Sequence, residues 1–76
     1  MNTIGGLVEG REVYHVPASL SVREAARYMT ERRVGAVSVL EGTRLVGVLS
    51  ERDLMGRVVA PGLDPDATRV GEVMSR

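Results

Sequence analysis

The chain has 76 residues, ten acidic and ten basic side chains, one His and no Cys. This length allows one small domain, and the lack of Cys excludes a disulfide framework, a thiolate metal site and a Cys nucleophile. The neutral net charge disfavours general binding to nucleic acid, which needs a basic surface. All ten basic residues are Arg, whose guanidinium group binds phosphate in a bidentate fork, although a compositional bias of the lineage explains the set as well.

Apolar runs in the sequence are short. The longest, residues 45–49, is interrupted by a Gly and falls far below the roughly 20 residues that a membrane span needs. The first twenty residues have no basic start followed by an apolar stretch, so we expect no signal peptide and a cytoplasmic location.

The first predicted elements are a strand and a helix. Residues 11–17 contain β-branched side chains and end at a Pro, which indicates a short strand. Ser21 followed three residues later by Glu24 is a capping box, and apolar residues then recur at helical spacing. The sequence predicts a helix over about residues 22–33, with Met29 in the core.

A hairpin and a second helix follow. Residues 36–40 and 45–49 are apolar, and the Gly-containing turn between them predicts a hairpin. Ser50 is the expected N-cap of the next helix, which should end at residues 61–62. The apolar side chains expected to face the core from this helix are Leu54, Met55, Val58 and Val59.

The order β-α-β-β-α predicts an α+β fold, with a three-stranded mixed sheet and two helices on one face. The second and third strands are apolar at nearly every position, which is typical of strands buried on both faces. The other face of the sheet therefore needs a cover, and we expect a second copy of the chain to supply it in a homodimer. The contact should be drawn from Val37, Val39, Val46 and Val48.

A short internal repeat bounds this unit. Residues 4–8 and 70–74 share the pattern apolar, Gly, any residue, apolar, apolar, and they lie one β-α-β-β-α unit apart. We therefore divide the chain into an N-terminal segment (1–10), one motif (11–62), and a linker with the start of a second motif (63–76).

Residues 21–29, 34–39 and 45–54, in this order and spacing, resemble a CBS domain, the small motif first named from cystathionine β-synthase. Such motifs usually occur as tandem pairs, called Bateman modules, whereas this chain carries one. The resemblance implies the β-α-β-β-α CBS fold and a regulatory module without catalytic activity or a cofactor. It also implies clefts between paired motifs that bind an adenosine-containing ligand such as AMP, ATP, NADH or S-adenosylmethionine.

The family's Gly-x-x-Ser/Thr-x-x-Asp motif matches Gly47, Ser50 and Asp53. The amides of a helix N-terminus favour an anion, and Arg52 adds a guanidinium group that can bind phosphate. Asp53 can accept hydrogen bonds from two ribose hydroxyls. A structural role, in which Ser50 and Asp53 only cap the helix, is the alternative, and the two roles are compatible.

The family's base pocket maps between the end of the first strand and the start of the second, where small and apolar residues leave room for a purine. Core and turn positions explain some of these residues equally well, as a solvated surface explains the further phosphate candidates Arg33 and Arg57. The residues that the resemblance assigns to the base pocket are Val16, Pro17, Ala18, Val34, Gly35, Ala36 and Val37.

Two functions are open at this point: a regulatory module that binds an adenine nucleotide, and a structural dimerisation domain without a ligand. We expect no enzyme, because Ser50 and Asp53 are three residues apart on one helical turn and cannot flank His15 in a catalytic triad. We also expect no metal site, since Asp64 and Asp66 lie in a loop and would hold Mg²⁺ only weakly.

Overall fold

The structure, a computed structural model, describes residues 14–76. The first copy of the internal repeat and the beginning of the first predicted strand, residues 11–13, lie outside this range. Within it, no helix has the length and apolar character that crossing a membrane requires. The elements in chain order are β1 (His15–Pro17), α1 (Val22–Arg32), β2 (Ala36–Glu41), β3 (Arg44–Ser50), α2 (Glu51–Leu54), the π-helical turn η1 (Met55–Val59) and α3 (Val70–Val73).

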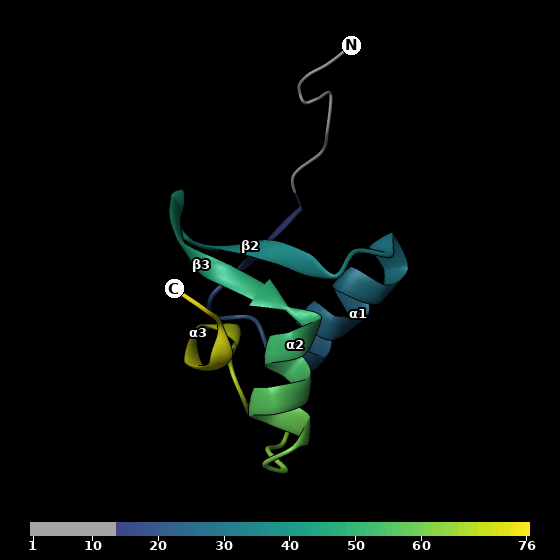
Figure 1. Cartoon of the computed structure of the whole chain (residues 1–76). Helices are drawn as coiled ribbons and strands as arrows, with labels where there is room; N and C mark the ends of the chain where they lie inside the picture. The colour runs from purple at the N-terminus through teal and green to yellow at the C-terminus, as the bar shows by residue number, and fades with distance from the viewer. Residues whose placement is uncertain (1–13) are drawn as a thin grey trace.

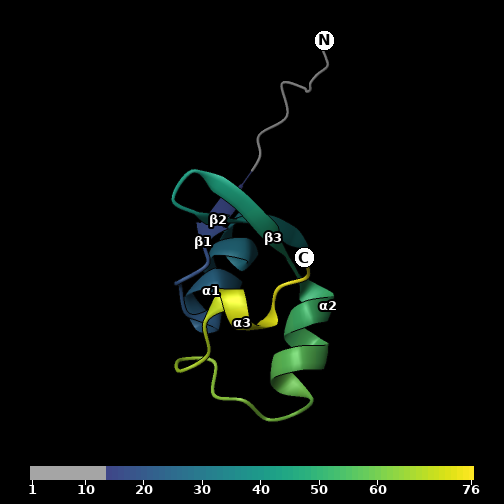
Figure 2. The same cartoon turned by 90° about the vertical axis from the view of Figure 1, so that its left-hand side faces the viewer.

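The sheet has the strand order β1-β2-β3 and is mixed, as predicted. Figure 1 shows β2 and β3 side by side, and Figure 2 labels all three strands. β1 pairs with β2 in parallel, and β2 pairs with β3 in the predicted hairpin. Gly42 occupies the tight turn of this hairpin with φ of 62°, a conformation that glycine adopts without a steric penalty. The helices all lie on one side of the sheet (Figure 2), which confirms the predicted α+β architecture.

Local capping explains where α1 begins. The Ser21 hydroxyl accepts a hydrogen bond from the Glu24 amide at 3.2 Å, which satisfies one of the free amides of the first turn. Met29 and two smaller side chains, Val22 and Ala25, are buried on the face that meets the sheet. The predicted helix is confirmed to within one residue, since Arg33 is its C-cap.

The core lies between the sheet and the helices, so one face of each strand is buried and the other faces outwards. Val37 and Val39 of β2, with Leu49 of β3, point towards the helices and are buried. Val48 points to the opposite face and is 44% exposed, while Val46 is half-buried against the core. The sequence did not show which of the four valines face the helices; the structure places Val37 and Val39 there, which leaves Val46 and Val48 for a contact on the outer face.

The second predicted helix differs from expectation in its final turn. Here the Ala60 amide donates to the Met55 carbonyl at 2.9 Å, five residues back, so the side chains are spaced differently from those of an α-helix. Val58 is buried, but Met55 and Val59 are 64% and 65% exposed. The prediction that both face the core is wrong, because Leu54 and Val58, four residues apart, form the inward face, and Met55 and Val59 each lie one residue further round the helix.

A third helical turn, α3, completes the core, although the sequence indicated only the start of another motif there. Val70 donates its amide to the Leu20 carbonyl, and Gly71 donates to the Ala18 carbonyl, both at 2.9 Å. Val70, Val73 and Met74 are buried. The segment expected to open a second motif thus packs against the loop between β1 and α1 of its own chain.

Arg33 offers a test of the backbone energetics, because it is the one non-glycine residue with positive φ (56°) among residues 14–76. We expect Arg33→Gly to raise the free energy of unfolding by about 0.5–1 kcal/mol. Glycine adopts the left-handed conformation without the steric cost that an L-residue has, and this gain exceeds the stability that glycine loses because its unfolded chain is more flexible. Urea denaturation measures the change. Arg27→Gly, in the exposed interior of α1, is the matched control and should lower stability by about 1 kcal/mol. Equal or reduced stability of Arg33→Gly would contradict this interpretation.

Candidate functional site

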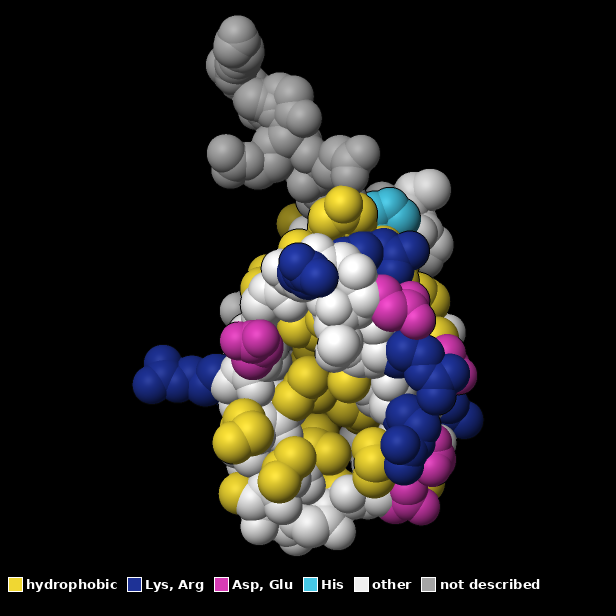
Figure 3. Space-filling view, turned by 90° about the vertical axis from the view of Figure 1, so that its right-hand side faces the viewer, with side chains coloured by type: hydrophobic (Ala, Val, Ile, Leu, Met, Phe, Trp, Pro, Cys, Tyr) yellow, Lys and Arg dark blue, Asp and Glu magenta, His cyan; other side chains and the backbone are white. Residues whose placement is uncertain are grey.

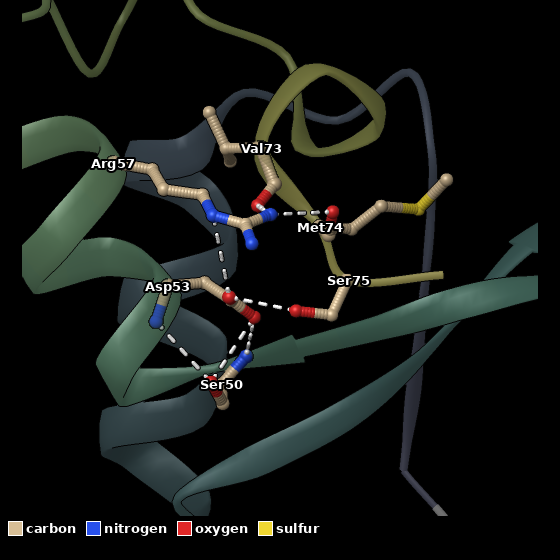
Figure 4. A network of polar contacts seen from close by, with 6 residues as sticks. All are labelled: Ser50, Asp53, Arg57, Val73, Met74 and Ser75. Atoms are coloured by element: carbon tan, nitrogen blue, oxygen red, sulfur yellow. Dashed lines mark hydrogen bonds and ion pairs between the residues drawn. The ribbon is translucent and has the colours of Figure 1, made fainter.

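Ser50 and Asp53 meet where β3 ends and α2 begins (Figure 4). The Ser50 hydroxyl accepts a hydrogen bond from the Asp53 amide at 3.2 Å, and the Ser50 amide donates to the Asp53 carboxylate at 2.9 Å. This reciprocal pair is a capping box, and it satisfies two backbone amides at the helix start. The structural role that the sequence left open for these two residues is therefore present.

The Asp53 carboxylate is buried, with 6% of the residue exposed, and each of its oxygens has a partner. Oδ2 accepts hydrogen bonds from the amide and the hydroxyl of Ser50, at 2.9 and 3.0 Å. Oδ1 accepts one from the Ser75 hydroxyl at 2.9 Å, and Arg57 Nε lies 3.9 Å away. Ser75 thus binds the carboxylate that the resemblance assigns to ribose binding.

Arg57 connects Asp53 to α3. Its Nη1 donates to the carbonyls of Val73 and Met74, both at 3.0 Å, where the short helix ends. A cation there is favourable, because its N–H groups satisfy carbonyls at the end of the helical turn that have no partner within the helix. Arg57 is half-exposed, and in this structure it binds the chain's own backbone.

Gly47 completes this arrangement through its lack of a side chain. A Cβ atom at this position would lie 2.6 Å from the Ser75 carbonyl oxygen and 2.8 Å from the Met74 sulfur. Ser75 can therefore pair with Val48 through two backbone hydrogen bonds of 2.8 Å along the edge of β3. All three positions of the predicted motif, Gly47, Ser50 and Asp53, thus help to hold the C-terminal residues.

Opposing effects act on the pKa of Asp53. Burial alone would raise this pKa, but the hydrogen bonds from the Ser50 amide, the Ser75 hydroxyl and the Ser50 hydroxyl, together with the charge of Arg57, outweigh burial. The pKa of Asp53 is therefore lowered from its ordinary value. The network is built around the ionised carboxylate.

The structure separates the two halves of the predicted base pocket. Because β1 runs parallel to β2, the end of β1 lies beside Leu40 at the end of β2, and not beside the start of β2. Val16 and Val37 are buried in the core beneath the sheet. Pro17 and Ala18 line a cavity of about 480 Å³ together with Leu40 and Gly71.

The other half of the predicted pocket lies next to the motif. Val34 and Gly35 line a separate cavity of about 430 Å³ with Glu51, between the end of α1 and the start of α2. The Gly35 carbonyl accepts the Glu51 amide at 2.9 Å, and the exposed Ala36 pairs with Ser50 across the sheet. Within this chain, the residues assigned to the base pocket are therefore divided between the core and two separate cavities, and the cavity next to Gly35 is lined by Glu51, the residue after Ser50.

Arg52 is exposed on the first turn of α2. The sequence did not predict that Ser75 and the carbonyls of Val73 and Met74 take part in the network around Asp53 and Arg57, because no local pattern indicates a contact across 22 residues. Within residues 14–76, no three His, Asp or Glu side chains gather in a way that could hold a metal ion.

A further cavity lies away from Ser50 and Asp53. It is an apolar groove of about 710 Å³ between α1 and η1, and its lining includes Leu54, Val58 and Leu63. Figure 3 shows apolar side chains gathered in a hollow, with a row of charged side chains along one side. Neither Ser50 nor Asp53 lines this groove.

Acid should weaken the fold through Asp53. Because the folded pKa is lowered, the contribution of the ionised carboxylate is fully present above the unfolded pKa of about 3.9 and is lost as the pH falls through the folded pKa. We expect Asp53→Asn to lower the free energy of unfolding by about 1–3 kcal/mol at pH 7. The difference between wild type and variant should shrink below about pH 4.

Urea unfolding of both proteins between neutral and acidic pH measures this dependence. The control is Glu31→Gln, which changes an exposed carboxylate and should shift stability by less than about 0.5 kcal/mol at pH 7. A stability difference between wild type and Asp53→Asn that stays constant with pH would show that the charge of Asp53 is unimportant.

Comparison with known proteins agrees with this geometry. The family model for the CBS domain matches residues 8–60. The protein YhcV of Bacillus subtilis, a CBS domain-containing protein, is 41% identical over 64 residues, which are 84% of this chain and 45% of YhcV. The chain spans less than half the length of the curated relatives it matches, and only 11% of one from Arabidopsis thaliana.

Solved structures share the fold. A putative signal-transduction protein with CBS domains from Burkholderia ambifaria superposes with a TM-score of 0.82 at 36% identity, over 87% of this chain and 48% of that one. A CBS domain protein from Pyrobaculum aerophilum, solved in complex with AMP, has a TM-score of 0.77 at 31% identity, over 86% of this chain and 50% of that one. By sequence and by structure, the chain belongs to the CBS domain family.

Proposed function

We propose that the chain is a regulatory module that binds an adenosine-containing nucleotide beside Ser50 and Asp53. The observation that carries this proposal is the arrangement at the start of α2, where Ser50 and Asp53 bind each other and the next residue, Glu51, lines the cavity beside Gly35. The AMP complex of the similar Pyrobaculum aerophilum protein supports the choice of ligand class. No step of catalysis is proposed.

Each part of the nucleotide has a chemical counterpart in this region. The exposed guanidinium of Arg52 can bind a phosphate in a bidentate manner, which favours AMP, ATP or NADH over S-adenosylmethionine. The carboxylate of Asp53 can accept ribose hydroxyls. The cavity of about 430 Å³ lined by Val34 and Gly35 has a volume within the usual range for small-molecule sites and is the proposed position of the base.

A second copy of the chain is the proposed partner. The outer face of the sheet, opposite the helices, carries exposed apolar side chains at Leu45 and Val48. An isologous dimer through this face would imitate a tandem pair of motifs and produce two equivalent clefts.

A structural dimerisation domain without ligand is the second candidate. One observation favours it: the Asp53 carboxylate is already satisfied by Ser50 and Ser75 of the same chain. In that case the motif would only fasten α2 to the C-terminal residues, and the cavity beside Gly35 would have no ligand.

Calorimetry distinguishes the two candidates. We expect AMP to bind, and we expect Arg52→Ala to weaken its affinity by roughly tenfold, because one charge-assisted phosphate contact is lost. Adenosine, which lacks the phosphate, should bind both proteins equally. Arg27→Ala, an exposed Arg on α1, is the matched control. The absence of binding heat with AMP, ATP, NADH and S-adenosylmethionine at millimolar concentration would favour the structural domain.

Light scattering tests the dimer, for which we expect twice the monomer mass at micromolar concentration. Val48→Arg places a charge on the outer face of the sheet and should raise the dimer dissociation constant by at least about a hundredfold, since an unpaired charge in an interface is costly. Val59→Arg, on the exposed helical side, should leave the dimer intact. The opposite pattern would place the interface at the helical groove, and a monomeric wild type would contradict the dimer.

A further inference from the structure

We infer that residues 75–76, here called the C-terminal strap, compete with the nucleotide's ribose for Asp53, so that ligand binding displaces the strap from the edge of β3. The inference rests on the proposed function, because it concerns the same carboxylate. It adds a conformational response to ligand binding within this one chain.

Three separate contacts hold the strap. Ser75 and Val48 exchange two backbone hydrogen bonds of 2.8 Å. The Ser75 hydroxyl donates to Asp53 Oδ1 at 2.9 Å. Arg57 binds the Met74 carbonyl at 3.0 Å, immediately before Ser75 (Figure 4).

The ribose and the strap cannot both use Asp53 in this conformation. Oδ2 is taken by the amide and hydroxyl of Ser50, which belong to the helix cap. Oδ1 faces the strap, and its hydrogen-bond donor is the Ser75 hydroxyl. Since Asp53 is only 6% exposed, a ribose diol reaches Oδ1 only after Ser75 has moved away.

The exchange is energetically feasible because one hydroxyl donor replaces another. The carboxylate stays ionised and hydrogen-bonded in both states, so it is never left buried without a partner. Ser75 itself is exposed, whereas the preceding Met74 is buried and anchors the end of α3. Movement can therefore be confined to the residues after Met74, without disruption of the core.

Displacement of the strap has a consequence at the edge of the sheet. The amide and carbonyl of Val48 lose their partners in Ser75 and become free to pair with another strand. Ligand binding at Asp53 would thus expose a strand edge at Val48, whose side chain lies on the outer face proposed for the dimer.

The test is a calorimetric cycle on the whole chain, with AMP and 2′,3′-dideoxy-AMP as probes and Ser75→Ala as the variant. Removal of the competing hydroxyl should tighten AMP binding by roughly tenfold, the effect of one hydrogen bond to a charged group. Dideoxy-AMP has no ribose diol to take the place of Ser75, so its affinity should be the same for both proteins. Ser19→Ala, an exposed serine in the loop after β1, is the control and should match the wild type with both probes.

The outcomes separate the inference from the proposed function. If wild type binds AMP and Ser75→Ala binds it no more tightly, or if dideoxy-AMP gains equally, competition is overturned while nucleotide binding stands. If only Ser75→Ala binds AMP, the strap blocks the site fully and the inference is supported. If neither protein binds AMP, the proposed function fails and the inference is overturned with it.

Discussion

The buried carboxylate of Asp53 is the contact on which the arrangement of this small domain depends. It joins the cap of α2, through Ser50, to the C-terminal residues, through Ser75, and it lies within ion-pair distance of Arg57. A buried charge is costly unless it is paired and hydrogen-bonded, so the partners of Asp53 are a condition for the fold as well as for any ligand. Under the proposed function, the same carboxylate would serve both stability and recognition, and a nucleotide would have to replace one of its existing partners.

The remainder of the structure follows from how a short chain covers a three-stranded sheet. The helices cover one face, and α3 returns to the loop between β1 and α1 with its buried Val70 and Val73. Ser75 continues this path along the edge of β3, where Gly47 leaves space for it. The edge of β3 is thus protected from pairing with other strands in the conformation described, while the outer face retains exposed apolar side chains.

The elements with local signals were predicted well from sequence. Ser21 and Ser50 cap their helices through contacts within three residues, and Gly42 forms the hairpin turn, so short windows contain the necessary information. The base pocket was assigned from the family resemblance, although the parallel pairing implied by the predicted mixed sheet already puts the end of β1 beside the end of β2, as the structure shows. The partner of Asp53 was missed because Ser75 lies 22 residues away. The exposure of Met55 and Val59 was missed because four apolar residues in adjacent pairs do not show which pair, Leu54 with Val58 or Met55 with Val59, faces the core.

Amide hydrogen exchange, resolved to single residues with and without saturating AMP, tests most directly whether the ligand and the strap exclude each other at Asp53. The amides of Ser75 and Val48 bond to each other's carbonyls and should be protected in the free protein. With AMP bound, both should exchange faster, while the Val22 amide, which donates to the Thr68 carbonyl next to α1, should stay as protected as before. Undiminished protection of Ser75 and Val48 in the AMP-saturated protein would contradict the account.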